Sequence, residues 1–167
     1  MSEIATNQAM TMAGLNLIQQ ALSIYDSDLR LVVSNERFRS MFALPDWIVT
    51  PGADFAATIR YIAEHGEYGA VDDIDAFVQE RVDLAGAFEP HYFERQRGDG
   101  RWVSVEGSPL PNGGWVTVYT DITEIKQQEA LLRTRSEALS EQVLVRSEEL
   151  ASTNRKLASS NAALEET

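Results

Sequence analysis

The chain has 167 residues, a formal net charge of −12 at pH 7, two His and no Cys. This length suffices for one ordinary hydrophobic core and excludes a large multidomain enzyme. The lack of thiols excludes disulfides, cysteine zinc sites, iron–sulfur clusters and cysteine nucleophiles, and it predicts a cytoplasmic location. The acidic charge disfavours nucleic acid and anionic membrane surfaces as partners. We expect no signal peptide and no membrane-spanning helix, because no apolar run approaches the ~20 residues required.

Composition divides the chain into two parts. Every Trp, Tyr, Phe, Gly and Pro precedes Thr123, whereas residues 124–167 consist almost wholly of strong helix formers and small polar residues. This shift predicts a domain boundary, followed by one continuous helix of roughly 66 Å at ~1.5 Å per residue. A helix of this length needs a partner.

The first predicted elements are a helix and a hairpin. Apolar residues recur at spacings of three and four over residues 10–22, which favours a short amphipathic helix. Two apolar stretches, 23–25 and 31–33, follow on either side of the polar turn Asp26–Asp28. This pattern is typical of two antiparallel strands.

Helix-capping residues mark the middle of the globular part. Asn35, Asp54 and either Asp72 or Asp73 are suited to the N-cap position, where a side-chain oxygen accepts a backbone N–H. Gly66 supplies a stop for the second of these helices. The predicted helices are 36–42, 55–64 and one that begins after residue 72 or 73.

The last third of the globular part has the period of strands. Residues 88–96, 101–107 and 115–120 are strand-like, and Gly98-Asp99-Gly100 and Pro111-Asn112-Gly113-Gly114 between them are strong hairpin signals. We therefore predict an antiparallel meander. Both faces of its last strand carry apolar residues, so one face meets the helices and the other needs a cover, either the N-terminal helix or a second subunit.

Two strands, several short helices, three strands and a long helix follow one another in the order of a PAS domain. Residues 23–42 resemble the opening PAS segment, and residues 97–124 are similar to the closing strands with their terminal Asp-Ile-Thr. The resemblance implies an α+β PAS fold, with a five-stranded antiparallel sheet, helices on one face, an N-terminal helix and a long C-terminal coiled-coil helix. In that family the triad joins the last strand to the output helix, which makes Asp121, Ile122 and Thr123 candidates for signal transmission. The implied domains are 1–22, 23–123 and 124–167.

Residues 148–164 resemble the coiled coil that precedes the dimerisation and phosphoacceptor helices of bacterial sensor histidine kinases. The resemblance implies the N-terminal part of a longer signalling protein, with no catalytic site in this chain. The parent would then phosphorylate a histidine and act on a response regulator, in a two-component system. Similar linkers precede diguanylate cyclase domains, and a ligand-free structural homodimerisation domain is a third interpretation.

Two series of apolar residues, each with a spacing of seven and offset by four, lie along the tail. An unbroken heptad would make alternate core layers polar. A four-residue stutter between Leu139 and Leu150 instead places Asn154 and Asn161 at position a, where Asn fixes the register of a parallel dimer. We favour the stutter, and we expect a homodimer through the coiled coil and the PAS domain; the alternative is a single helix packed on its own domain. The predicted interface is Ile125, Leu132, Leu139, Val143, Leu150, Asn154, Leu157, Asn161 and Leu164.

Few residues point to chemistry. His65 lies at a helix end, in the region where haem-binding PAS domains carry their ligand, but a second haem signal is lacking. Flavin adducts in this family need a Cys, and the acidic cluster at residues 72–75 lacks the spacing of a calcium loop. We therefore expect no catalytic residue, no metal, no haem and no noncovalent flavin.

Aromatic side chains with polar tips suit an internal cavity for a small organic ligand between the helices and the sheet. The alternative is that these rings form an ordinary core. The candidate pocket residues are Tyr25, Phe42, Trp47, Tyr61, His65, Trp102 and Tyr119.

Overall fold

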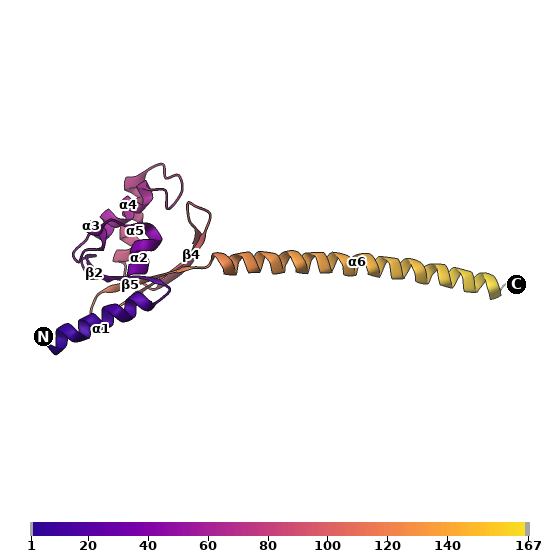
Figure 1. The fold of residues 1–167 in the computed structure, drawn as a ribbon. Coiled ribbons are helices and arrows are strands. Elements are labelled where there is room, and N and C mark those ends of the chain that lie inside the picture. Colours follow the sequence, from indigo (N-terminus) through magenta and orange to yellow (C-terminus); the bar gives the residue numbers. More distant parts are fainter. Residues whose placement is uncertain (1, 166–167) are drawn as a thin grey trace. The chain divides into compact units, whose positions relative to one another are not determined.

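The computed structural model describes residues 2–165, and the chain divides into two compact units, Met1–Thr123 and Glu124–Thr167. The second unit is the single helix α6 (Thr123–Glu165), drawn in orange to yellow in Figure 1. The elements of the first unit are α1 (Glu3–Leu17), β1 (Ala21–Tyr25), β2 (Leu31–Ser34), α2 (Glu36–Phe42), α3 (Asp46–Val49), α4 (Phe55–Glu64), α5 (Ile74–Gly86), β3 (His91–Gln96), β4 (Trp102–Pro109) and β5 (Trp115–Asp121).

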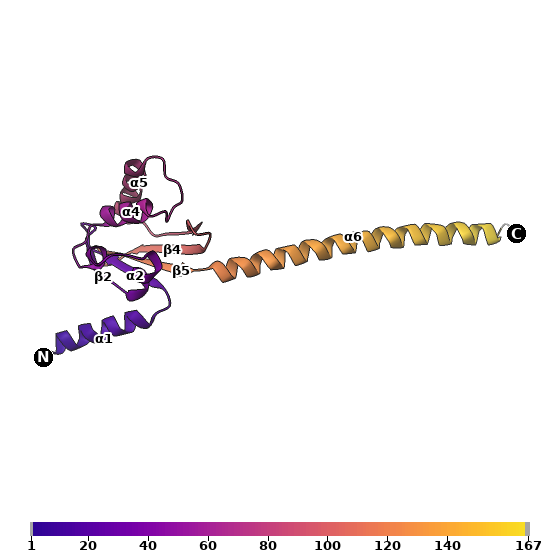
Figure 2. The same ribbon diagram turned by 45° about the horizontal axis from the view of Figure 1, so that its top comes forward.

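The five strands form one antiparallel sheet in the order β2-β1-β5-β4-β3. The first and last strands pair at its centre, from Ala21 opposite Tyr119 to Tyr25 opposite Trp115. Helices α4 and α5 lie on one side of the sheet and α1 lies on the other (Figure 2). The predicted α+β class, with its five-stranded antiparallel sheet and long C-terminal helix, is confirmed.

Asn35 joins three elements. Its side-chain oxygen accepts the N–H of Phe38 at 3.1 Å, as predicted for an N-cap, and also the N–H of Leu22 at 3.0 Å. Its amide nitrogen donates to the carbonyls of Leu15, at 3.0 Å, and Gln20, at 2.8 Å. Because this buried amide has partners for both ends, it stabilises the chain where α1 ends, β1 begins and α2 starts.

Two other predicted caps are confirmed. The carboxylates of Asp54 and Asp73 accept the backbone N–H groups of Ala57, at 3.3 Å, and Ala76, at 3.1 Å. These bonds satisfy N–H groups that have no partner inside a helix. They set where α4 and α5 begin.

The core lies between the sheet and the helices. Phe38 and Phe42 of α2 pack on Tyr119 of β5, with ring centroids 5.8 and 5.0 Å apart. Tyr25 meets the edge of Phe55 at 5.3 Å. Such edge-to-face and tilted contacts stabilise aromatic pairs beyond the area they bury.

The helix predicted over residues 10–22 is wrong at both ends. Helix α1 begins at Glu3 and ends at Leu17, and Ile18 already has an extended backbone. Leu22 instead lies in β1 opposite Val118. Leu22 is therefore apolar because it belongs to the sheet and not to a helix. No residue of α1 itself is buried.

Two further boundaries differ from the prediction. Strand β3 begins at His91 rather than at residue 88, because Phe88 has a φ of +50° and Pro90 has no N–H to donate to a ladder. The short helix α3 (Asp46–Val49) is not among the predicted elements; it follows Pro45 and buries Ile48.

The hairpin between β3 and β4 approaches the loop after α4 backbone to backbone. The N–H of Gly98 donates to the carbonyl of Glu67 at 2.9 Å. A Cβ at Gly98 would lie 1.8 Å from the carbonyl oxygen of Gly66. Space alone, not an unusual φ, therefore requires glycine at this position.

We expect Gly98→Ala to lower the free energy of unfolding by about 1–3 kcal/mol, because two backbone segments must move apart to admit the methyl group. Urea denaturation measures the change. Gly86→Ala is the control, since a Cβ there meets nothing within 4 Å and Ala favours helix by up to about 1 kcal/mol. Equal stabilities for the two variants would show that the contact is not tight.

Candidate functional site

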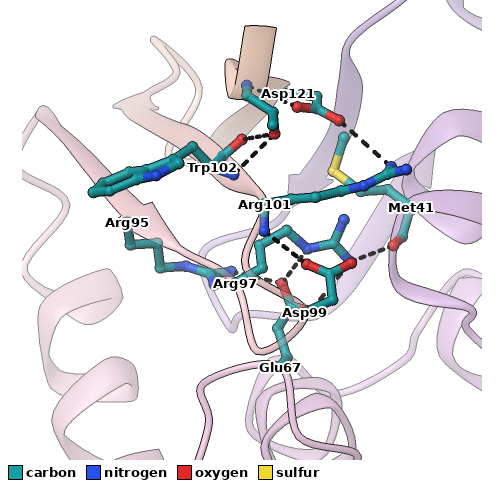
Figure 3. A network of polar contacts seen from close by, with 9 residues as sticks. Met41, Glu67, Arg95, Arg97, Asp99, Arg101, Trp102 and Asp121 are labelled. Atoms are coloured by element: carbon teal, nitrogen blue, oxygen red, sulfur yellow. Dashed lines mark hydrogen bonds and ion pairs between the residues drawn. The ribbon is translucent and has the colours of Figure 1, made fainter. Parts of the chain in front are cut away.

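The buried carboxylate of Glu67 bonds the β3–β4 hairpin to the helical part of the domain, and we call its contacts with Arg95 and Arg97 the clamp. Glu67, in the loop between α4 and α5, accepts bonds from Arg97 Nε at 2.8 Å and Arg95 Nη2 at 3.3 Å. The side chains of all three residues are at most 14% exposed. Arg97 also donates to the carbonyl of Met41, in α2, at 2.6 Å (Figure 3). The hairpin is thereby bonded both to α2 and to the loop that follows α4.

The other strand of the hairpin is bonded to the predicted signalling triad. The N–H of Trp102 donates to the Thr123 hydroxyl at 2.9 Å, and the N–H of Ile122 donates to the Trp102 carbonyl at 2.9 Å. Arg101 lies 3.7 Å from the Asp121 carboxylate, which accepts the N–H of Thr123 at 3.0 Å (Figure 3). Direct contacts therefore lead from the helices, through the hairpin, to the triad.

The electrostatics of the triad favour a charged Asp121. The hydrogen bonds from Thr123 are the largest cause of its lowered pKa, and the Arg101 and Arg97 charges act in the same direction. Ile122 is buried, which holds the middle of the triad in the domain. Asp121 is thus an acceptor at the position where β5 ends.

A small cavity of about 50 Å³ lies between α4, α5 and the sheet. Its apolar lining includes Ile59 and Val105. Its polar lining comes from Tyr68, Arg81, His91, Arg95, Thr117 and Tyr119. Burial is the main cause that raises the pKa of the Tyr68 and Tyr119 hydroxyls, so both stay protonated. Burial also lowers the pKa of His91, with the Arg81 charge acting in the same direction. The cavity thus presents hydroxyls, a neutral imidazole and two guanidinium groups.

Of the seven predicted pocket residues, only Tyr119 lines this cavity. Phe42 is packed against Tyr119, and Tyr25 is buried against Phe55, where burial raises its pKa to about 12. Trp102 belongs to the opposite face of the sheet from Val105, since alternate residues of a strand face opposite ways.

The remaining three predicted pocket residues form a separate group. Tyr61 stacks on His65 with ring centroids 4.0 Å apart, and Trp47, which is 54% exposed, meets Tyr61 edge-on at 6.0 Å. Nδ1 of His65 lies 2.7 Å from the carbonyl of Tyr61. The structure does not bring these rings to the cavity; Tyr61 and His65 instead line, together with Phe42, a separate hollow beside Glu67 and Arg97.

Sequence reasoning missed Arg81 and Arg95. One signal was available for Arg95, which shares the inward face of β3 with His91 and Phe93 by the two-residue period of a strand. Arg81 similarly lies among the apolar residues of α5, one residue before Val82. Charged residues at inward positions of such patterns are candidates for buried polar sites.

Helix α6 continues without a break through the predicted stutter. The apolar members of the predicted interface are exposed, and so are Leu144 and Val145 next to Val143. The coiled-coil register remains a prediction. The exposed apolar members are Ile125, Leu132, Leu139, Val143, Leu150, Leu157 and Leu164.

Membrane-spanning helices and metal-binding groups are both absent from residues 2–165. None of the helices described in this range is long and apolar enough to cross a bilayer. The same residues include no group of three or more His, Cys, Asp or Glu side chains placed to hold a metal ion.

Comparison with known proteins identifies the family. A family model described as PAS fold matches residues 15–130. The PAS domain of Bordetella pertussis BvgS has the same fold, with a TM-score of 0.55 and 16% identity over 80% of this chain and 98% of that structure. The chain belongs to the PAS family, and the predicted resemblance is confirmed.

Two curated proteins of Caulobacter vibrioides contain a similar segment. The Non-motile and phage-resistance protein is 32% identical over 134 residues, which are 79% of this chain and 14% of that protein. Sensor protein DivL is 28% identical over 142 residues, which are 77% of this chain and 17% of that protein. The chain thus spans less than a fifth of the length of either relative.

The lowered pKa of His91 predicts a pH-dependent stability. Unfolded, this histidine binds a proton near pH 6.5, whereas the folded protein binds it only at lower pH. The contribution of neutral His91 to the free energy of unfolding is therefore complete above about pH 7, and it is lost as the pH falls through the pKa of His91 in the folded protein.

His91→Phe should reduce the loss of stability between about pH 7.5 and about pH 5, because the ring remains but the titration does not. Urea denaturation at the two pH values measures the slope. His65→Phe is the control that keeps His91 and should keep its slope. Identical slopes in wild type and His91→Phe would contradict the assignment.

Proposed function

We propose that this chain is the sensory and dimerisation module of a longer cytoplasmic signalling protein, and that it transmits a conformational change through Asp121, Ile122 and Thr123. The contact network from Glu67 through the β3–β4 hairpin supports this role most directly. A shift of the helices or of the hairpin changes contacts that end at the triad. Such a shift alters the populations of output states only by as much as its contacts differ between them.

The second part of the proposal is a parallel homodimer through residues 124–167. The seam residues of α6, led by Leu132, Leu150 and Leu157, expose more than half of their surface in the single chain. Fully burying each such side chain stabilises a dimer by up to about 1.5–3 kcal/mol. The polar residues Asn154 and Asn161 then favour a two-stranded register.

The PAS domain adds to this dimer. Helix α1 exposes Ile4, Met10 and Leu17, and β2 exposes Val32. Exposed apolar side chains of this kind suit contact with a second copy of the domain. We therefore place part of the dimer interface at α1 and the outer side of the sheet.

The proposed output of the longer protein is a histidine kinase that acts on a response regulator. The similarity to a protein named Sensor protein DivL supports a sensor, and the small share of that relative covered here leaves room for an output domain. This chain would supply no catalytic residue and would hold no haem, flavin or metal.

We predict that replacing Leu150 and Leu157 together by Asp gives monomers, because two buried layers would then carry four carboxylates in the dimer. Light scattering of the purified chain measures the mass. The matched control, Ser152→Asp with Ser159→Asp, adds the same charge at the same spacing but on the outer side in both heptad frames. A dimer that persists with both Leu replaced would move the main interface to the PAS domain.

Asp121→Ala should uncouple the PAS domain from the output while leaving the dimer intact. The test needs no known stimulus. Glu67→Gln weakens the clamp on the hairpin, and its effect on autophosphorylation of the longer protein should disappear when Asp121→Ala is also present. The control is Asp75→Ala, which removes an exposed ion pair with Arg60 and should leave the effect of Glu67→Gln unchanged. Additive effects of Glu67→Gln and Asp121→Ala would exclude the route through the triad.

A further inference from the structure

The internal cavity contains nitrogen atoms that lack partners. Arg81 Nε and Arg95 Nη1 are buried and have no hydrogen-bond partner, and both residues line the same cavity. A buried donor without an acceptor costs about 1–3 kcal/mol, and more when it is charged. Two such donors at one cavity indicate a missing acceptor rather than two unrelated defects.

The charge at the cavity is also unbalanced. Glu67 is the acid that pairs with Arg95, and the same carboxylate also serves Arg97. Among residues 2–165, Arg81 forms no salt bridge to any carboxylate. Burying a guanidinium without a counter-charge is unfavourable, even in a domain whose net charge is strongly negative.

Aromatic rings surround Arg81 but leave its Nε–H unsatisfied. The guanidinium carbon lies 4.9 Å from the centre of Phe77, 5.6 Å from Tyr68 and 5.9 Å from Phe93. Cation–π contacts attract the charge to the ring faces. They do not replace a hydrogen bond in the guanidinium plane, where an oxygen acceptor binds.

The volume of the cavity limits the size of the molecule that can supply the acceptor. A volume of about 50 Å³ is far below the ~300–1,000 Å³ typical of sites for drug-sized ligands, so the cavity suits only a small molecule. Carboxylates match the fork of an arginine better than a spherical ion does. The side chains of Ile59, Leu84 and Val105 offer an apolar contact for a methyl group.

We propose that this cavity binds a small monocarboxylate of the size of acetate, with its oxygens accepting bonds from Arg81 Nε and Arg95 Nη1. The ligand provides the counter-charge that Arg81 lacks. This inference names the ligand class of the proposed sensory module and rests on that function. Arg95 is bonded to Glu67. Binding of the ligand to Arg95 therefore changes the contacts of Glu67 with the β3–β4 hairpin, which is bonded to the triad.

Titration with sodium acetate, against sodium chloride at equal ionic strength, tests the site. Acetate should raise the Tm of the wild type in a saturable way, since a ligand that binds only the folded state stabilises it by mass action. Arg81→Met removes the guanidinium but keeps an unbranched side chain about as far as Nε, and it should weaken acetate binding at least tenfold. Arg60→Met, which removes an exposed arginine of α4 bonded to Asp75, should bind acetate like the wild type.

A second measurement does not depend on the variants. The ¹H–¹⁵N signal of Arg81 Nε in the wild type should shift saturably with acetate and not with chloride. Equal Tm shifts in all three proteins, or a saturable chloride response equal to that of acetate, would overturn the proposal. Failure of acetate binding with intact coupling between Glu67 and Asp121 rejects the ligand alone; lost coupling with intact binding rejects the signalling role alone.

Discussion

The Glu67 carboxylate holds together three parts of the domain that are distant in the chain. It bonds to Arg97, 30 residues later, and Arg97 reaches Met41, 56 residues earlier. Removing one partner of such a buried pair typically costs 3–5 kcal/mol, because the other charge is left without compensation. The position of the β3–β4 hairpin, and with it the bonds from Trp102 to the triad, depends on this pair.

The same carboxylate connects the cavity with the signalling triad. Arg95 lines the cavity, has no partner for Nη1 and bonds to Glu67 with Nη2, while Arg97 bonds to the same acid. One acid thus serves a residue that can meet a ligand and a residue that positions the hairpin. In the function we propose, competition for its oxygens would carry the occupancy of the cavity to Asp121.

Close packing makes this coupling effective. Gly98 allows the hairpin to approach the carbonyl of Gly66, and Gly107 leaves room for two rings, since a Cβ there would lie 2.3 Å from Trp115 and 2.7 Å from His91. Packed interiors are stiff, so movement of one segment displaces its neighbours. In the dimer we propose, the two competing heptad frames of α6 would by contrast allow arrangements of similar stability.

The sequence by itself determined the two-part organisation, the caps at Asn35 and Asp54, and a third cap at one of two adjacent Asp residues, because these features depend on composition and on contacts within a few residues. The resemblance of its segments to PAS domains added the class of the fold and the triad as a hypothesis. Only the tertiary structure decided where the polar groups meet. The predicted pocket joined aromatic residues by type, but packing separates Trp47 and His65 from the cavity and brings Arg81 and Arg95 into it. Whether a charged side chain lies inside the domain depends on partners tens of residues away in the chain. A pattern of neighbouring residues does not show which distant residues will be in contact.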